Sequence, residues 1–172
     1  MRKSISCGLA VAVAVLANSI YPTTFVAAQQ DHAMMGRGAM VMGFDQEKTT
    51  HHFRLYEDGG SIEVTANSGD DSANRTAIRD HLPHIAQMFA AGNFDAPMEV
   101  HAQRVPGSAE LARLREKVSY KYVELPNGGR VDILTTDAAA LRAVHEFLKF
   151  QIMDHKTGDP ATVGKRPSNK QP

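Results

Sequence analysis

The stretch THHFRLYEDGGSIEVTA, residues 50–66, decides the fold class because two alternating runs flank a turn-forming sequence. Polar and apolar side chains alternate from Thr50 to Tyr56, and they alternate again from Ser61 to Ala66. Between the two runs lies Glu57-Asp58-Gly59-Gly60. A turn rich in Asp and Gly between runs of period two predicts a β-hairpin.

The same order of features returns later in the chain, in residues 118–134, VSYKYVELPNGGRVDIL. An alternating run from Val118 to Glu124 leads into Pro126-Asn127-Gly128-Gly129, and Val131–Leu134 predicts the returning strand. Both predicted hairpins turn through Gly-Gly and precede a helical pattern. We interpret this as a duplicated strand–strand–helix unit.

Each predicted hairpin is followed by a helix with its own start and stop signals. The first helix runs to about Ala91 and ends at Gly92-Asn93, and the second runs from Ala138 to about His155 and ends before Gly158. The candidate N-caps are Asp70, Asp71 and Ser72 for the first helix, and Thr136 and Asp137 for the second. We expect each helix to have an apolar stripe, and the two stripes follow the same spacing. They are Ile78, Leu82, Ile85 and Phe89 in the first helix and Leu141, His145, Leu148 and Ile152 in the second.

Two such units predict an α+β two-layer sandwich in a single domain, residues 49–159. Their hairpins can pair into one four-stranded antiparallel sheet, with both helices on one face, and this arrangement buries every apolar stripe. Between the units we expect an extended piece around Met98 and Val100 and a short helix capped by Ser108.

The first 28 residues have the parts of a cleavable export signal. Arg2 and Lys3 form a basic start, an apolar stretch runs from Leu9 to Leu16, and small residues precede a cleavage site after Ala28. The apolar stretch is shorter than the roughly 20 residues that span a membrane, so we expect no stable anchor. The sequence therefore predicts a periplasmic or secreted protein.

Both flanks of the predicted domain lack a regular pattern. Residues 29–48 contain glycine, glutamine and methionine without periodicity, and we expect an extended or mobile N-terminal arm. Residues 160–172 are rich in proline and basic side chains and almost lack apolar ones, so we expect a disordered tail.

Composition excludes several classes of function. Cys7 is the one cysteine of the 172 residues and lies in the predicted signal. After cleavage the chain has no cysteine, which excludes disulfides, thiolate nucleophiles and cysteine-based metal sites. The full chain has 19 Lys and Arg against 19 Asp and Glu, and loss of Arg2 and Lys3 leaves a slight acidic excess. Such a balance does not favour nucleic acid as a partner.

The clearest candidate for chemistry is a group of donors around Pro83 in the first helix. His81, His84 and Met88 are spaced by three and four residues, so they fall on one side of a helix, beside its apolar stripe. Pro83 removes a backbone hydrogen bond, and we expect a kink or break near His81. Instead of binding a metal, Met88 could pack in the hydrophobic core, because methionine fills irregular gaps well.

Further candidate ligands come from other parts of the chain. His51 and His52 are neighbours on a strand, so only one of them can face the helices. His145 lies on the expected apolar stripe of the second helix, where a hydrogen-bonded core residue is the alternative. His155 near the end of that helix is also explained by the helix dipole. The arm adds four methionines, Met34, Met35, Met40 and Met42.

A mixed set of imidazoles and thioethers predicts a metal-binding protein, with copper as the first candidate metal. Thioether sulfur favours Cu(I), whereas imidazole also accepts zinc and nickel, which we rank lower. We expect binding, buffering or delivery of copper without turnover. The alternative is a non-catalytic module that binds a protein partner and whose histidines are structural. No G-x-S-x-G, phosphate-binding glycine loop or H-E-x-x-H motif marks an enzyme.

Three stretches resemble a family of small exported bacterial proteins whose activity is not established. They are Met42–Phe53, His81–Phe89 and His145–Ile152, the last followed by Asp154-His155 and Thr157-Gly158-Asp159, and the resemblance extends over residues 42–159. Some members carry an aspartate carbamoyltransferase name. This sequence does not support that activity, because it lacks a Ser-Thr-Arg-Thr phosphate loop.

Overall fold

The computed structural model describes residues 33–34 and 36–167 of the chain. The predicted signal peptide, residues 29–32 and Met35 of the arm, and residues 168–172 of the tail lie outside the described residues. The strands are β1 (Thr49–Tyr56), β2 (Gly59–Ala66), β3 (Val118–Leu125), β4 (Gly128–Thr135) and β5 (Val163–Gly164). The helices are α2 (Ser72–Ala90), α3 (Asp95–His101), α4 (Ser108–Arg113) and α5 (Ala138–Asp154), with a 3-10 turn at Arg115–Lys117.

The duplication predicted from the sequence is confirmed, since β1-β2-α2 is followed by β3-β4-α5. The sheet order is β3-β4-β2-β1-β5, and the four strands of the two hairpins are antiparallel. Ile62 and Val131 pair directly, and each is the third residue after the first glycine of its hairpin. An approximate two-fold axis therefore passes between these two residues.

Aspartate side chains start both long helices, as the sequence predicted. The Asp71 carboxylate accepts a hydrogen bond from the Asn74 backbone N–H, and the Asp137 carboxylate accepts from Ala139 and Ala140. These bonds satisfy backbone donors that have no partner inside the helix. α2 continues without a break through Pro83.

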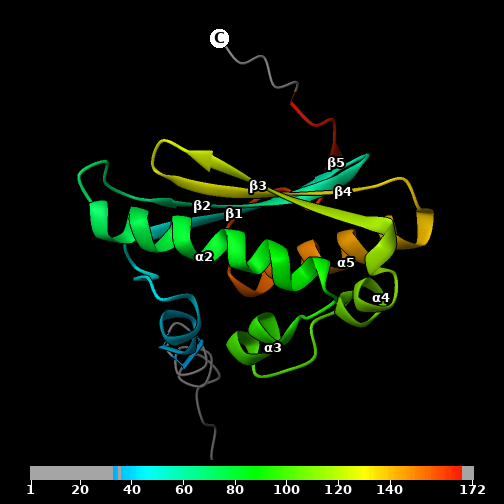
Figure 1. Cartoon of the computed structure of the whole chain (residues 1–172), viewed down its shortest axis with the longest axis horizontal. Helices are drawn as coiled ribbons and strands as arrows, with labels where there is room; N and C mark the ends of the chain where they lie inside the picture. The colour runs from blue at the N-terminus through cyan, green and yellow to red at the C-terminus, as the bar shows by residue number, and fades with distance from the viewer. Residues whose placement is uncertain (1–32, 35, 168–172) are drawn as a thin grey trace, which may run out of the picture.

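Both long helices cover the same face of the sheet, as Figure 1 shows. α2 packs chiefly against β3 and β4, whereas α5 packs chiefly against β1 and β2. Each helix therefore covers the hairpin of the other unit. The close approach depends on glycines: a Cβ at Gly60 would clash with Leu148 Cδ1 of α5, and a Cβ at Gly129 would lie 3.1 Å from Leu82 Cδ1 of α2.

The buried stripe of α5 differs from the expected one. Ala140, Val144 and Leu148 are buried, whereas Leu141 and His145 are half-buried beside them. Leu148 and Ile152 of the expected stripe are buried, and Ala140 and Val144 take the places expected for Leu141 and His145. Leu148 packs over Gly60 of β2, where the missing side chain leaves room for the helix.

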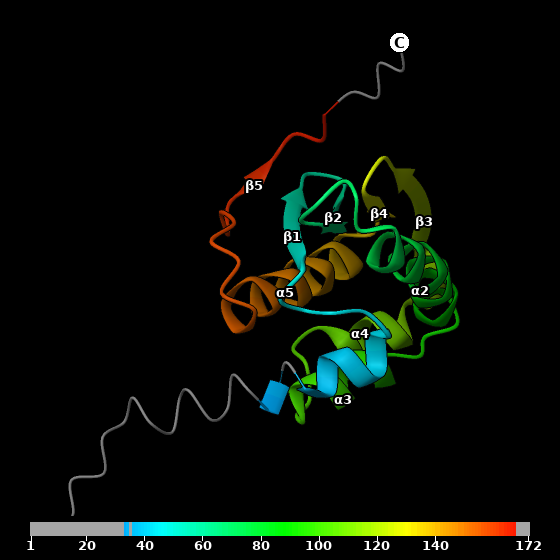
Figure 2. The same cartoon turned by 90° about the vertical axis from the view of Figure 1, so that its left-hand side faces the viewer.

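Short helices add a partial third layer below α2 and α5, as Figure 2 shows. The expected extended piece around Met98 is instead the helix α3, and α4 begins at Ser108 with Gly107 at its N-cap. Residues 36–42 are helical rather than extended, and they lie beside α3. Arg37 Nε joins the two by donating to the Val100 carbonyl oxygen at 2.9 Å.

The first part of the expected disordered tail is ordered against the sheet. β5 pairs in parallel with β1, so the sheet has five strands and is mixed. Arg166 then binds the Asp58 and Asp132 carboxylates and the Gly60 and Ile133 carbonyl oxygens, and its guanidinium lies 4.5 Å from the Tyr56 ring centre. Ion pairs and strand pairing, rather than apolar burial, hold this segment in place. Its composition, which almost lacks apolar residues, therefore did not predict that it is ordered.

Among residues 33–34 and 36–167, none of the helices combines the length and the apolar character needed to cross a lipid bilayer.

Candidate functional site

A pocket lies between α2 and α5, beneath the inner face of β1 and β2. α3 and the helix of residues 36–42 close it on the side away from the sheet. Its volume of about 70 Å³ gives room for a few water molecules or for a small ligand. Phenylalanine and aliphatic side chains make up most of its lining.

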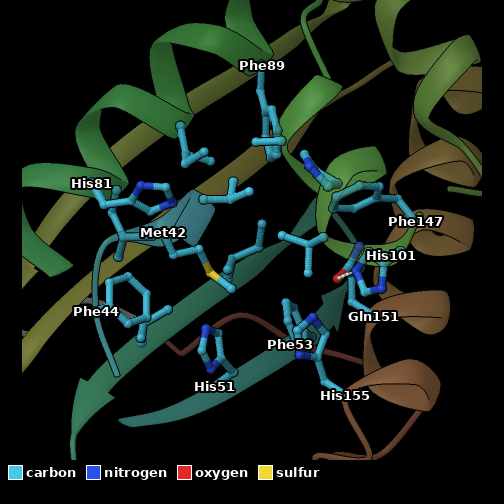
Figure 3. A pocket seen from close by; sticks show the side chains of 18 residues that line it. Met42, Phe44, His51, Phe53, His81, Phe89, His101, Phe147, Gln151 and His155 are labelled. Carbon is cyan, nitrogen blue, oxygen red and sulfur yellow. Dashed lines mark hydrogen bonds between the residues drawn. The ribbon is translucent and has the colours of Figure 1, made fainter. Parts of the chain in front are cut away.

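Six polar or sulfur-containing side chains stand out in this apolar lining, and Figure 3 labels all of them. They come from five separate segments of the chain. We call the site the imidazole pocket and define it by Met42, His51, His81, His101, Gln151 and His155.

His51 of β1 faces the helices, and its neighbour His52 faces the opposite side of the sheet. This alternation was expected from the strand. His51 Nε2 is shielded from solvent and has no hydrogen-bond partner in the described part of the chain. Burial, followed by the nearby His155, His81 and His52, lowers the pKa of His51 to about 3. His51 is therefore neutral near pH 7, with an unpaired nitrogen inside the pocket.

His155, the C-cap residue of α5, lies against His51. Their ring centroids are 5.5 Å apart and their planes differ by 18°. Phe53 adds a further ring contact, with a centroid distance of 5.4 Å. Burial, followed by the charge of His101, lowers the pKa of His155 to about 4, against a small opposing effect of Asp154.

His81 projects into the pocket from α2. Its ring meets Phe44 edge to face, with the centroids 5.7 Å apart. Burial, followed by the nearby His84, lowers the pKa of His81 to about 4. Three neutral imidazoles therefore line one apolar pocket, and in Figure 3 the Met42 sulfur projects between His51 and His81 in this view.

His101 of α3 ties that helix to α5 at the other end of the pocket. Its Nδ1 forms a hydrogen bond with Asp154 Oδ2 at 2.5 Å, and its Nε2 forms one with Gln151 Oε1 at 3.0 Å. Gln151 Nε2 is buried without a partner among the described residues, so the pocket holds a second unpaired polar atom.

The other ligand candidates from the sequence lie outside the pocket. His84 is exposed on α2, and Met88 packs against the core. His52 pairs with Asp159, Nδ1 to Oδ1 2.9 Å, on the opposite face of the sheet. His145 donates from Nε2 to the Tyr56 and Gly59 carbonyl oxygens, and Met40 is 84% exposed. Of the predicted helical set, His81 alone lines the pocket.

The arrangement limits what kind of metal the pocket can hold. Within residues 33–34 and 36–167, no three His, Cys, Asp or Glu side chains gather as a metal-binding group. Zinc sites usually have four such ligands in a tetrahedron. Any metal here would therefore combine few imidazole nitrogens with the thioether of Met42.

Sequence reasoning did not single out His101 or Gln151, and for His155 it offered the helix dipole as an explanation. His101 lies in α3, which lacks a clear helical pattern because Pro97 interrupts a segment of only seven residues. Gln151 is three residues after Leu148 on the buried side of α5, and a buried glutamine between apolar neighbours was the signal that could have found it.

No protein-family model, curated protein or solved structure matches this chain. The function is therefore argued from the imidazole pocket alone, and the resemblance to a family of exported proteins stays a prediction.

Proposed function

We propose that this protein is an exported copper-binding protein that holds Cu(I) in the imidazole pocket and buffers or delivers it without turnover. The observation that carries the proposal is His51 Nε2, a shielded nitrogen without a partner, in a pocket that Met42 also lines. A buried polar atom without a partner costs free energy, which a bound metal would recover. Copper buffering or delivery outside the cytoplasm also fits the predicted signal peptide.

The proposed ligands are His51 Nε2 and Met42 Sδ, joined by a nitrogen of His81 or His155. All three imidazoles have lowered pKa values, so at neutral pH each ring keeps one unprotonated nitrogen that can bind a metal. Neutral imidazole is the form that binds metals. Thioether sulfur is a soft donor and selects Cu(I).

The charge of the pocket also favours Cu(I) over zinc or nickel. The proposed ligands are all neutral, and the lining is largely apolar. The cost of moving an ion out of water grows with the square of its charge, so a divalent ion would pay about four times the cost of Cu(I). Zinc and nickel therefore remain the less favoured metals.

The proposal is tested by anaerobic competition between residues 29–172 and a coloured Cu(I) chelator. We expect one Cu(I) per chain, and we expect His51→Ala or Met42→Leu to weaken binding by about tenfold or more. His84→Ala is the matched control, because His84 lies on the same helix as His81 but is exposed. Unchanged affinity in both pocket variants would refute this ligand set.

The second candidate is a periplasmic module that binds a protein partner. Three histidines support it, because His52, His101 and His145 are each held by hydrogen bonds within the protein. The same titration separates the two candidates. Absence of Cu(I) uptake by the unaltered chain would leave the interaction module as the better explanation.

A further inference from the structure

We propose that Cu(I) enters the imidazole pocket through a hollow beside it, with Met34 as its first protein ligand and Met42 as the ligand that passes it inward. This inference rests on the copper binding proposed above. It adds a transient metal site at the surface and a direction of transfer.

The hollow is adjacent to the pocket and larger than it. Its volume is about 330 Å³, and we call it the outer hollow, defined by Met34, Gly38, Met42, Thr50, His51 and His155. Met42, Val100, His51 and His155 line both cavities. These shared side chains lie between the two cavities, and the proposed route requires that Met42 changes its rotamer as the ion passes.

The helical residues 33–34 and 36–42 supply three of the residues that line the outer hollow. They are Met34, Gly38 and Met42. Gly38 is buried, and a Cβ there would lie 3.2 Å from Met42 Cε and 3.4 Å from Gln46 Cδ. The missing side chain at Gly38 therefore allows Met42, which lines both cavities, to pack closely against the backbone.

Methionine suits a transfer ligand for physical reasons. Its side chain is unbranched and flexible, so it can reach an ion on either side of its resting position. Each step exchanges one neutral ligand for another, copper stays Cu(I), and no proton is released. The inner end also offers more imidazole, because His51 and His155 line both cavities whereas His81 lines the imidazole pocket alone.

Met40 provides a matched control in the same helix. It carries the same thioether but is 84% exposed and lines neither cavity. If sulfur on the helix were sufficient for capture, Met40 and Met34 would act alike. The proposal requires that only Met34 matters.

The experiment is anaerobic stopped-flow transfer of Cu(I) from bathocuproine disulfonate to residues 29–172. We expect Met34→Leu to slow uptake by about tenfold while the final affinity stays within about twofold, because Met34 is not a resident ligand. Gly38→Val should also slow uptake, since its side chain fills the space beside Met42. Met40→Leu should match the unaltered chain.

Each other outcome counts against the proposal. Equal uptake rates for Met34→Leu and Met40→Leu would overturn the entry route while leaving copper binding intact. A loss of final affinity in Met34→Leu would make Met34 a resident ligand and would also overturn the route. If the unaltered chain takes no copper from the chelator at equilibrium, both this inference and the proposed function fail.

Discussion

The rings of His51 and His155 stack with their centroids 5.5 Å apart, and this contact joins strand β1 to the end of helix α5. Burial opposes a charge on either ring, and protonation of both would place two like charges that repel strongly at that distance. The contact that helps to form the pocket is therefore also its acid-sensitive point.

Stability should fall steeply as the pH is lowered from about 6.5 towards 4. The pKa of His51 is lowered to about 3 and those of His81 and His155 to about 4, from the ordinary value of 6.5. Between these limits the unfolded chain binds more protons than the folded chain, so acid favours unfolding. Each imidazole contributes at most about 1.4 kcal/mol per pH unit, and urea denaturation at a series of pH values measures the slope.

The variant His155→Phe supplies the control for this pH dependence. It keeps an aromatic ring against His51 but removes one titrating group, so the slope should become shallower. A curve that is flat from pH 7 to pH 4 in the unaltered chain would contradict the expectation.

Gly60→Ala should destabilise the fold by about 2 kcal/mol or more, the usual cost of overpacking a core. A Cβ at Gly60 would meet Leu148 of α5 and would lie 2.6 Å from the Arg54 carbonyl oxygen, which cannot move without bending β1. Gly69→Ala is the control, because its Cβ would lie 3.9 Å from the nearest atom, in ordinary contact. Equal denaturation midpoints for the two variants would argue against helix–sheet contact at this point.

Arg166→Ala should lower stability by about 1–3 kcal/mol, because it removes several hydrogen bonds from a charged donor to partly buried acceptors, although Arg130 still donates to Asp132. Asp132 is 9% exposed and accepts from Arg166 Nη1 at 2.8 Å. Arg113→Ala removes an exposed ion pair with Glu110 and should leave the midpoint unchanged. Faster amide exchange at Glu57, whose N–H donates to the Gly164 carbonyl oxygen, would show in the Arg166 variant that β5 has detached.

Bound Cu(I) should raise the melting temperature, and zinc should not. At a free Cu(I) concentration of about 100 times Kd, binding adds about 2.7 kcal/mol, or an increase of roughly 5–10 °C for a chain of this size. The increase should disappear in His51→Ala and persist in His84→Ala. An equal increase with zinc would contradict the preference for a soft monovalent ion.

Much of the fold followed from local signals. The two Gly-Gly hairpins, the caps at Asp71 and Asp137 and the inward orientation of one of His51 and His52 all depend on residues close in sequence. These features can be predicted because turn chemistry and strand alternation act over a few residues.

The pocket could be predicted only in part, because it depends on contacts between distant residues. The stacking of His155 on His51 joins segments about 100 residues apart, and Arg166 forms a hydrogen bond with Asp58, which is 108 positions away in the sequence. Helical spacing grouped His84 and Met88 with His81, but α2 turns those two away from the space that His81 faces. Tertiary packing decides which side of a helix lines a cavity. The spacing of residues along the helix does not predict this.

The exchange of helices between the units bears on how such a chain could have arisen. α2 lies over β3 and β4, and α5 lies over β1 and β2, about an axis between Ile62 and Val131. One unit alone would leave its hairpin uncovered, whereas two separate copies would complete each other as a homodimer. Fusion of two genes for such a dimer would yield this topology, and it would convert a concentration-dependent assembly into a single cooperative folding event.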